Sequence, residues 1–450
     1  MWNYKEAEIF LEKAKKLGSV PGLENIQNLM KELGNVQDKL SVIHVAGTNG
    51  KGSTCAMLER ILRQAGYCTG RYSSPAVFCA EEKYQINGVY INKEEFLSVL
   101  EKVAKACRRM TEKGMEHPTL FEVETAVAFV WFYQRKCQVV LLETGMGGAL
   151  DATNIIRKPL CSVITTISMD HMAFLGNDIR RIAEEKAGII KEGCPVITAF
   201  QQPEVYEVLQ EKCAKRNSDL IIADAGKIAN IHYDANYLVF DWDNWRNLQL
   251  SLLGTYQTEN AICAIKTIDQ LNRKGFCIKD DAIRMALKDT SWPGRFEILH
   301  KAPLIVMDGA HNEDAAKKLR KTLEMGFTNR KIIYIIGVLA DKEHEKMLAC
   351  MLPLAEKVYT VTPDNPRALS GEALCREAQA YHRNVQYAET IEAAVKKAMA
   401  DTREMQIAES QTDTARNVHQ EVQTPMILAF GSLSYLGELK HVVLHEVEAP

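Results

Sequence analysis

Three features are missing from this 450-residue sequence, and each absence excludes a class of protein. No apolar run approaches the roughly 20 residues that a membrane-spanning helix needs, so we expect no membrane partner. Neither sign of charge dominates, since 55 Lys and Arg face 58 Asp and Glu. We therefore expect no nucleic-acid partner held by bulk electrostatics. The N-terminus has no apolar signal segment, which favours a cytoplasmic protein.

Cysteine is present but not in any metal-binding or redox pattern. The twelve cysteines never form a C-x-x-C pair, and they lie scattered in apolar segments, as at Cys137, Cys161 and Cys263. This distribution is typical of buried, reduced thiols rather than of a zinc site or a disulfide framework. A chain of this length and ordinary composition is expected to hold two or three globular domains.

The most informative segment present is a glycine-rich run from Ala46 to Thr54, whose loop residues are Gly47, Thr48, Asn49, Gly50, Lys51, Gly52 and Ser53. It follows an apolar stretch and precedes a helical pattern. A strand, a glycine turn and a helix N-terminus make a phosphate cradle, because backbone N–H groups and the helix dipole point at anionic oxygens. Lys51 adds positive charge, and a hydroxyl from Ser53 or Thr54 suits Mg²⁺. The standard P-loop has Gly where this chain has Val45.

Apolar strand patterns alternate with helical ones along most of the chain, which predicts parallel sheets covered on both faces. The predicted fold class is α/β with two domains. Residues 1–293 would form a P-loop ATPase-like domain with a mostly parallel sheet, and residues 294–450 a smaller Rossmann-like domain. The segment Trp292-Pro293-Gly294-Arg295 is interpreted as a hinge. Residues 401–425 are polar and predict a mobile loop.

Polar side chains follow several predicted strands, where ligands bind in open α/β sheets. Ser74, Glu143 and His171 stand at three such ends, and together they favour a Mg²⁺ site near the phosphate loop. Taken singly, each is as well explained as a cap or turn residue. Asp308 and His311 follow a strand of the second domain and suit nucleotide contacts, although Asn312 beside them also fits a plain helix cap.

Taken together, the motifs resemble the folylpolyglutamate synthase/dihydrofolate synthase family of the Mur-ligase superfamily. The resemblance covers nearly the whole chain. It is carried by these segments: HVAGTNGKGS (44–53), YSSP (72–75), PTLFE (118–122), ETGMGGALDATN (143–154), SMDHMAFLG (168–176), EKAGI (185–189), GTYQTENA (254–261), PGRFE (293–297), DGAHN (308–312) and GVLADKE (337–343).

The resemblance implies roles for single residues. ATP contacts would come from Thr48, Asn49, Gly50, Lys51, Gly52, Ser53, Asn260, Arg295 and Asp308. Two Mg²⁺ ions would be held by Ser74, Glu143 and His171, with Lys186 carbamylated to help position the second. Lys51, Lys186 and His311 are the expected catalytic residues. The pterin would lie against Thr119, Leu120, Phe121, Glu122, Leu150, Asp151 and Ala152.

The implied activity is an ATP-dependent acid–amino acid ligase that adds L-glutamate to folates, and also to dihydropteroate, through an acyl phosphate. We expect a monomer with small-molecule substrates only. Three positions depart from the family pattern: Ala76, Ala149 and Tyr256 stand where many members have His, Arg and His. Two alternatives stay open, namely another Mur-type amide ligase, or an ATP-dependent conformational switch that ligates nothing.

Overall fold

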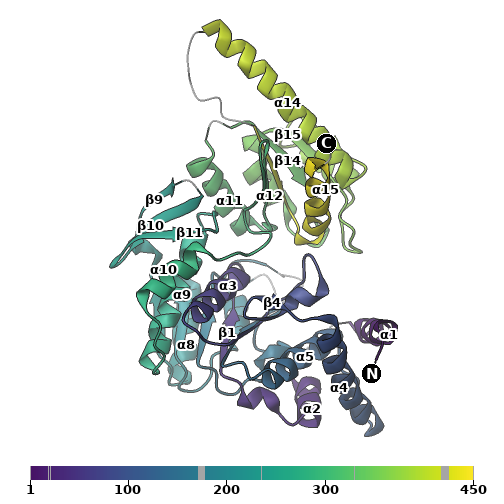
Figure 1. Cartoon of the computed structure of the whole chain (residues 1–450), viewed down its shortest axis with the longest axis vertical. Helices are drawn as coiled ribbons and strands as arrows, with labels where there is room; N and C mark the ends of the chain where they lie inside the picture. The colour runs from purple at the N-terminus through teal and green to yellow at the C-terminus, as the bar shows by residue number, and fades with distance from the viewer. Residues whose placement is uncertain are drawn as a thin grey trace. The chain divides into compact units, whose positions relative to one another are not determined.

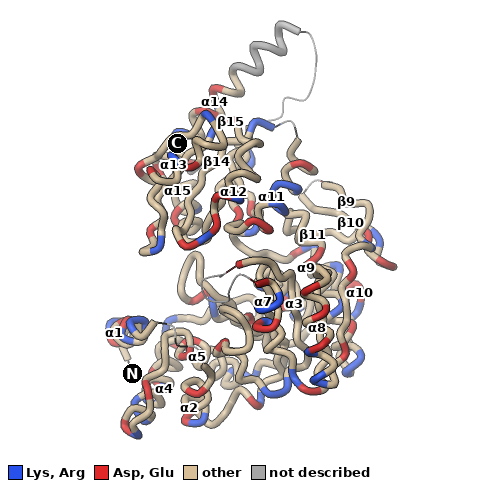
Figure 2. Tube along the Cα trace, turned by 180° about the vertical axis from the view of Figure 1, so that it is seen from behind, with Lys and Arg blue, Asp and Glu red and all other residues tan. Residues whose placement is uncertain are grey.

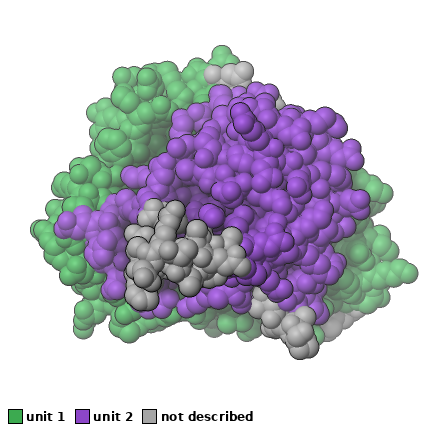
Figure 3. All heavy atoms as spheres, turned by 90° about the horizontal axis from the view of Figure 1, so that it is seen from above, with its two compact units in different colours: residues 1–229, 241–249, 258–290 green, residues 230–240, 250–257, 291–450 purple. Residues whose placement is uncertain are grey.

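The computed structural model describes residues 2–18, 20, 22–170, 178–234, 236–328, 330–416 and 425–448. The chain divides into two compact units, shown in green and purple in Figure 3. Unit 1 comprises residues 1–229, 241–249 and 258–290, and unit 2 comprises residues 230–240, 250–257 and 291–450. The division of the chain into domains at a single point, between residues 293 and 294, stays a prediction.

Unit 1 is built on one large sheet of eight strands, and six adjacent strands of this sheet run parallel. In spatial order the strands are β4 (Val89–Tyr90), β3 (Tyr84–Ile86), β2 (Thr69–Tyr72), β5 (Val139–Glu143), β1 (Val42–Ala46), β6 (Cys161–Ile164), β7 (Val196–Ala199) and β8 (Leu220–Ala223). β1 and β5 are buried along their whole length, which explains their unbroken apolar sequences. The antiparallel β3–β4 hairpin turns at Asn87-Gly88, both with positive φ, as a two-residue loop requires.

Helices surround this sheet, and their order along the chain is visible in Figure 1. They are α1 (Tyr4–Lys15), α2 (Glu24–Glu32), α3 (Lys51–Gln64), α4 (Lys93–Glu112), α5 (Leu120–Gln134), α7 (Ile179–Ala187), α8 (Pro203–Lys215), α9 (Gln257–Arg273) and α10 (Asp280–Lys288). α5 is mostly apolar and lies in the core of this unit, with Val123, Phe129 and Phe132 fully buried, while Tyr133 near its end is 39% exposed.

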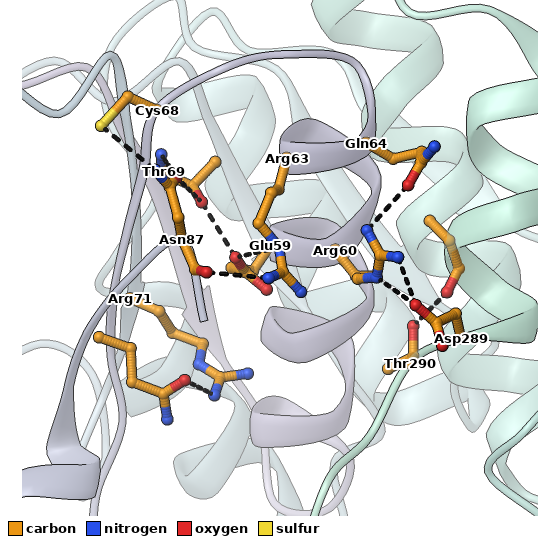
Figure 4. A network of polar contacts seen from close by, with 12 residues as sticks. Glu59, Arg60, Arg63, Gln64, Cys68, Thr69, Arg71, Asn87, Asp289 and Thr290 are labelled. Atoms are coloured by element: carbon orange, nitrogen blue, oxygen red, sulfur yellow. Dashed lines mark hydrogen bonds and ion pairs between the residues drawn. The ribbon is translucent and has the colours of Figure 1, made fainter. Parts of the chain in front are cut away.

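A polar network fixes α3, the helix that follows the phosphate loop, on both of its sides (Figure 4). Glu59 accepts a hydrogen bond from the Thr69 hydroxyl of β2 at 3.1 Å and pairs with Arg63 at 3.2 Å. Arg60 donates from Nε to Asp289, just beyond α10, at 3.0 Å. Buried polar groups of this kind need partners, so the network holds the helix in one position relative to the sheet.

Unit 2 holds a second sheet with the order β12 (Glu297–Lys301), β13 (Leu304–Met307), β17 (Met426–Phe430), β14 (Ile332–Ile336), β15 (Ala355–Thr360) and β16 (Val385–Tyr387). Only the edge strand β12 pairs antiparallel. Its helices are α11 (Glu313–Gly326), α12 (His344–Met351), α13 (Gly371–Ala378), α14 (Ile391–Arg416) and α15 (Leu436–Glu448). A three-stranded sheet of β11 (Trp245–Leu250), β10 (Tyr237–Trp242) and β9 (Ile228–Asp234) contains residues assigned to each unit. The predicted α/β class with a mostly parallel sheet and a second α/β domain is confirmed.

The predicted loop at 401–425 is wrong over its first part. α14 continues to Arg416 and extends well past the sheet of unit 2 in Figure 1, while residues 417–424 lie outside the described residues. Seven of the eleven residues from 400 to 410 are Ala, Glu, Gln, Met or Arg, which favour a helix. Polarity alone was therefore a poor guide, because an exposed helix is also polar.

In the part of the chain that the structure describes, the charged residues and the cysteines are distributed as the sequence indicates. Figure 2 shows basic and acidic residues mixed along the helices of both units. No described helix is long and apolar enough to cross a membrane. All twelve cysteines are free, among them the buried Cys137, Cys161 and Cys263.

Candidate active site

The glycine-rich run leaves the sheet of unit 1 at the carboxyl end of β1. β5 and β6 flank β1 on its two sides, with Val45 beside Glu143 and Ala46 beside Ile164. β2 lies beyond β5, with Tyr72 next to Leu142. The loop after β1, Ser74 after β2, Glu143 at the end of β5 and the segment after β6 therefore share one edge of the sheet, as parallel strands require.

The first residues of the loop are anchored to the segment that follows β6. The N–H groups of Thr48 and Asn49 both donate to the Thr166 carbonyl, at 2.9 and 3.2 Å. The Thr48 hydroxyl donates to the Ser168 carbonyl at 3.0 Å. The Ser168 N–H returns to that hydroxyl at 3.1 Å. Thr48 and Asn49 thus hold the loop in place through these groups.

The start of α3 presents backbone N–H groups that are suited to an anion. The helix begins at Lys51 after Gly50, which has φ +91°, and first-turn N–H groups have no partner inside a helix. Gly47 has φ +151°, and a Cβ there would lie 1.9 Å from the Thr165 hydroxyl oxygen. A Cβ on Gly50 would lie 2.2 Å from the side-chain oxygen of Asn260. Gly52 and Ser53 are buried in the same turn.

Two lysine ammonium groups converge on the loop. Lys51 donates to the carbonyls of Gly47 and Thr48 at 3.1 and 3.3 Å, and Lys186 of α7 donates to Gly47 at 3.0 Å. Lys186 is 4% exposed. Burial, and next the positive charge of Lys51, lower the pKa of Lys186 to about 7, against the opposing pull of Asp170 and other carboxylates. A lysine so placed is largely a neutral amine just above neutral pH.

Residues suited to Mg²⁺ stand at the same edge. The Ser74 hydroxyl oxygen is buried and has no hydrogen-bond partner among the described residues, and the Glu143 carboxylate is 6% exposed. An orphaned hydroxyl and a buried carboxylate at the same sheet edge fit a hard cation. His171, the third expected ligand, lies outside the described residues. Within the described part of the chain, no group of three or more His, Cys, Asp or Glu side chains is placed to hold a metal.

The glycine-rich segment after β5 packs directly on α7. A Cβ on Gly148 would lie 2.5 Å from the Glu185 carbonyl, and the Ala149 N–H donates to that carbonyl at 2.7 Å. The Asn154 amide bridges the carbonyls of Ala149 and Gly188 at 2.9 and 3.1 Å. The expected substrate segment at 150–152 and the lysine of α7 are therefore held together as one piece.

Asp151 belongs to a buried polar chain, whereas Leu150 beside it is half exposed. Asp151 caps the short helix at Ala152–Ile155. Its carboxylate accepts from the Thr153 hydroxyl at 2.5 Å and from the Met146 N–H at 2.9 Å. Burial raises the pKa of Asp151. The Thr153 hydroxyl also contacts His44 Nε2 at 2.9 Å, and burial lowers the pKa of His44 to about 3, so this imidazole is neutral.

The other expected pterin residues lie at the start of α5. Thr119 and Glu122 form a reciprocal capping box: Glu122 accepts from the Thr119 N–H at 2.8 Å and from its hydroxyl at 2.9 Å. Both side chains are buried and already paired, so their local role is structural. Leu120 and Phe121 are partly buried against the core. The Phe121 ring lies 6.3 Å from that of Tyr72.

In unit 2, Asp308 organises the expected nucleotide residues. Its carboxylate accepts from the Tyr256 hydroxyl at 2.5 Å, from the Phe296 N–H at 2.8 Å and from the Ala310 N–H at 2.8 Å. The guanidinium of Arg295 lies over Gly309, since a Cβ there would fall 1.9 Å from one of its nitrogens. His311 contacts the Gly309 carbonyl through Nδ1 at 2.8 Å.

Several residues of this site escaped the sequence analysis. Thr165, Thr166 and Ser168 form the bed of the phosphate loop. Thr165 and Thr166 are marked only by a polar run after a strand, whereas Ser168 begins the segment 168–176 that carries the family resemblance. Gln201, which contacts that bed, follows β7 with no pattern around it. Tyr256 was noted as a departure from the family, but its bond to Asp308 depends on the tertiary fold.

The comparisons with known proteins cover most of the chain. The family model of the Mur ligase middle domain matches residues 45–268, and that of the Mur ligase glutamate ligase domain matches residues 294–407. A dihydrofolate synthase/folylpolyglutamate synthase of Bacillus subtilis is 36% identical over 372 residues, covering 81% of this chain and 86% of the relative. A folylpolyglutamate synthase of Lacticaseibacillus casei is 33% identical over 375 residues, covering 82% and 87%.

Solved structures agree with these relatives. The Mycobacterium tuberculosis folylpolyglutamate synthase complexed with ADP has a TM-score of 0.86 at 28% identity and covers 99% of this chain and 98% of its own. E. coli FolC in complex with DHPP and ADP has a TM-score of 0.82 at 27% identity, with 98% of both chains covered.

Proposed function

Because this chain belongs to the folylpolyglutamate synthase/dihydrofolate synthase family of Mur ligases, we propose that it joins L-glutamate to the carboxyl group of folates, and of dihydropteroate, at the expense of ATP. The sequence-based prediction of an ATP-dependent folate ligase is confirmed at this level. The observation that carries the proposal is the phosphate loop with two lysines donating to one carbonyl, Gly47.

The reaction would proceed in two steps. A carboxylate oxygen of the pterin substrate attacks the γ-phosphorus of ATP, ADP leaves, and an acyl phosphate forms. The amine of glutamate then attacks the acyl carbon, and phosphate leaves with the bridging oxygen as the amide forms. Two anions must meet in the first step, so Lys51 and the N–H groups from Gly50 to Ser53 would neutralise the charge on the transferred phosphoryl group. On unit 2, we assign nucleotide contacts to Arg295 and Asp308.

Ser74 and Glu143 fit a Mg²⁺ ion, as argued above from the orphaned hydroxyl and the buried carboxylate. We propose that they hold Mg²⁺ together with His171. Mg²⁺ bound there would draw charge from the phosphate oxygens. Glu143 supplies the fixed negative charge, and its place at the end of β5 resembles a Walker-B carboxylate.

We propose that Lys186 reacts with carbon dioxide to form a carbamate, releasing one proton. The support is its burial, its lowered pKa of about 7 and its 3.0 Å bond to the loop, since only the neutral amine can attack carbon dioxide. The new carboxylate would turn a buried cation into an anion and add an oxygen ligand for a second Mg²⁺. Lys51, already beside it, would then balance the added negative charge.

The pterin would lie near Phe121 and Leu150, the less buried members of the expected set. Thr119, Glu122 and Asp151 would shape this region from behind through their hydrogen bonds. His311 stays a proposed catalytic residue on unit 2. We also propose that the protein acts as a monomer in the cytoplasm, which a mass measurement in solution and fractionation of cells would check.

One assay separates the ligase from a conformational switch. Purified protein is given ATP, labelled glutamate and either dihydropteroate or tetrahydrofolate, and both amide formation and ADP release are measured. A ligase sustains ADP release over many turnovers only when the pterin substrate and glutamate are both present, since without glutamate the reaction stops at the acyl phosphate. ADP release without them would favour the switch. Turnover with a cell-wall peptide precursor in place of the pterins would instead favour another Mur-type ligase.

A further inference from the structure

The bed of the phosphate loop is fastened by a single glutamine. Gln201 follows β7 and is 8% exposed. Its amide nitrogen donates to the Thr165 carbonyl at 2.9 Å, and its amide oxygen accepts from the Ile167 N–H at 3.1 Å. Together the two bonds span three residues, so the side chain pairs with the segment after β6 much as a neighbouring strand would.

This segment is the one on which the loop rests. Thr165 continues the pairing of β6 with β1, since its N–H donates to the Ala46 carbonyl at 2.8 Å. Thr166, between the two residues that Gln201 holds, accepts the N–H groups of Thr48 and Asn49. β6 itself ends at Ile164, and Gln201 pairs with the chain just beyond that point.

A third contact fixes the glutamine itself. Its amide nitrogen also lies 3.2 Å from the Thr198 hydroxyl on β7, so both ends of the amide are engaged and its orientation is set. The position of Thr166, and through it that of Thr48 and Asn49, thus depends on a side chain two strands away from β1 in the sheet.

We propose that Gln201 is a positioning residue for nucleotide binding, which fixes the phosphate loop by clasping residues 165–167. The proposal rests on the proposed function in so far as the loop binds ATP. It assigns Gln201 no contact with substrate. A glutamine that only filled space would leave the affinity for nucleotide unchanged.

The test measures binding of MgADP by calorimetry, with no folate and no glutamate present. Gln201→Met keeps the length of the side chain and removes both hydrogen bonds, so we expect the dissociation constant for MgADP to rise about tenfold. In the ligase assay the KM for ATP should rise while the KM for glutamate stays unchanged. Wild-type affinity for MgADP in folded Gln201→Met would overturn the proposal. If the wild-type protein binds MgADP but shows no ligase activity, the proposed function is refuted instead.

A second variant guards against a simple folding defect. Gln201→Glu keeps the acceptor for Ile167 but sets a carboxylate against the Thr165 carbonyl, unless the carboxyl group is protonated and can donate. Its affinity for MgADP should therefore improve as the pH is lowered, relative to wild type at each pH. A constant ratio to wild type across the pH range would contradict the clasp.

Gln37→Met is the matched control. Gln37 is also buried in unit 1, at 5% exposure, and its amide contacts Asn35 rather than the loop. We expect its thermal stability to fall without a change in MgADP affinity. Equal loss of affinity in both variants would mean that the effect is general destabilisation, and the proposal would fail.

Discussion

Lys186 should form a carbamate that an ordinary lysine does not. With a pKa of about 7, about 90% of the Lys186 side chains are neutral amines at about pH 8, against about 0.3% for a lysine with the ordinary pKa of 10.5. The reactive fraction is thus about 300-fold larger. Burial at 4% exposure then shields the product from water, although the carbamate still needs a cation such as Lys51 or Mg²⁺ beside it.

The assay is nuclear magnetic resonance of the protein in ¹³C-bicarbonate. We expect a carbamate signal that disappears in Lys186→Met. Lys191 provides a matched control, because burial lowers its pKa to about 8 and its ammonium donates to the Asn154 carbonyl at 3.0 Å. The signal should persist in Lys191→Met. A wild-type spectrum without the signal, or a signal that survives in Lys186→Met, would refute the reasoning.

The free energy of unfolding should also depend on the protonation of Lys186. Because the pKa of Lys186 is lowered in the folded state, the unfolded chain binds more protons between about pH 7 and the ordinary lysine pKa of 10.5. The free energy of unfolding contributed by this group therefore rises with pH across that window. Measured without bicarbonate, this rise should be smaller in Lys186→Met than in wild type. An identical slope would show that Lys186 titrates normally.

Three further predictions concern the loop, the metal site and the fold. Lys51→Ala and Glu143→Ala should abolish ATP-dependent ligation in folded protein, as checked by glutamate incorporation and circular dichroism. Near-normal turnover in either variant would refute the phosphate and metal assignments. Gly47→Ala should lose MgADP binding in calorimetry, because its Cβ would lie 1.9 Å from the Thr165 hydroxyl oxygen; unchanged affinity would show that the loop tolerates the shift. Thr119→Ala should lower the free energy of unfolding by about 1 kcal/mol in urea titrations, and no loss would mean that the capping box contributes nothing.

The elements that the sequence predicted best have strong local patterns. α9 (Gln257–Arg273) ends just before Gly275, and β13 (Leu304–Met307) is one unbroken apolar run. These patterns predict a helix end and a buried strand. α3 begins at Lys51 rather than at the first apolar residue, Cys55, since a loop that closes on a helix N-terminus places polar residues inside the first turn. The last part of α14 was predicted as a loop because an exposed helix and a polar loop have similar compositions.

The candidate site was predictable only where a motif spans consecutive residues. Lys51 and the loop glycines are recognisable from the glycine-rich motif itself. The closeness of Lys186 to Gly47 depends instead on how the fold places α7 near the end of β1. In the sequence, Lys186 is marked only by the resemblance to the ligase family. Thr166 acts through a backbone carbonyl that any residue type would supply. Gln201 acts through a side-chain amide hydrogen-bonded to backbone groups of Thr165 and Ile167, so no residue pattern marks either contact.

The central claim is that this chain uses ATP to activate a carboxylate. The most direct measurement starts from a pterin substrate whose reacting carboxyl group carries ¹⁸O, with ATP and glutamate added. If an acyl phosphate forms, one ¹⁸O per turnover passes to inorganic phosphate and the other remains in the amide, which mass spectrometry of both products detects. Amide formed with no ¹⁸O in the phosphate would contradict the account.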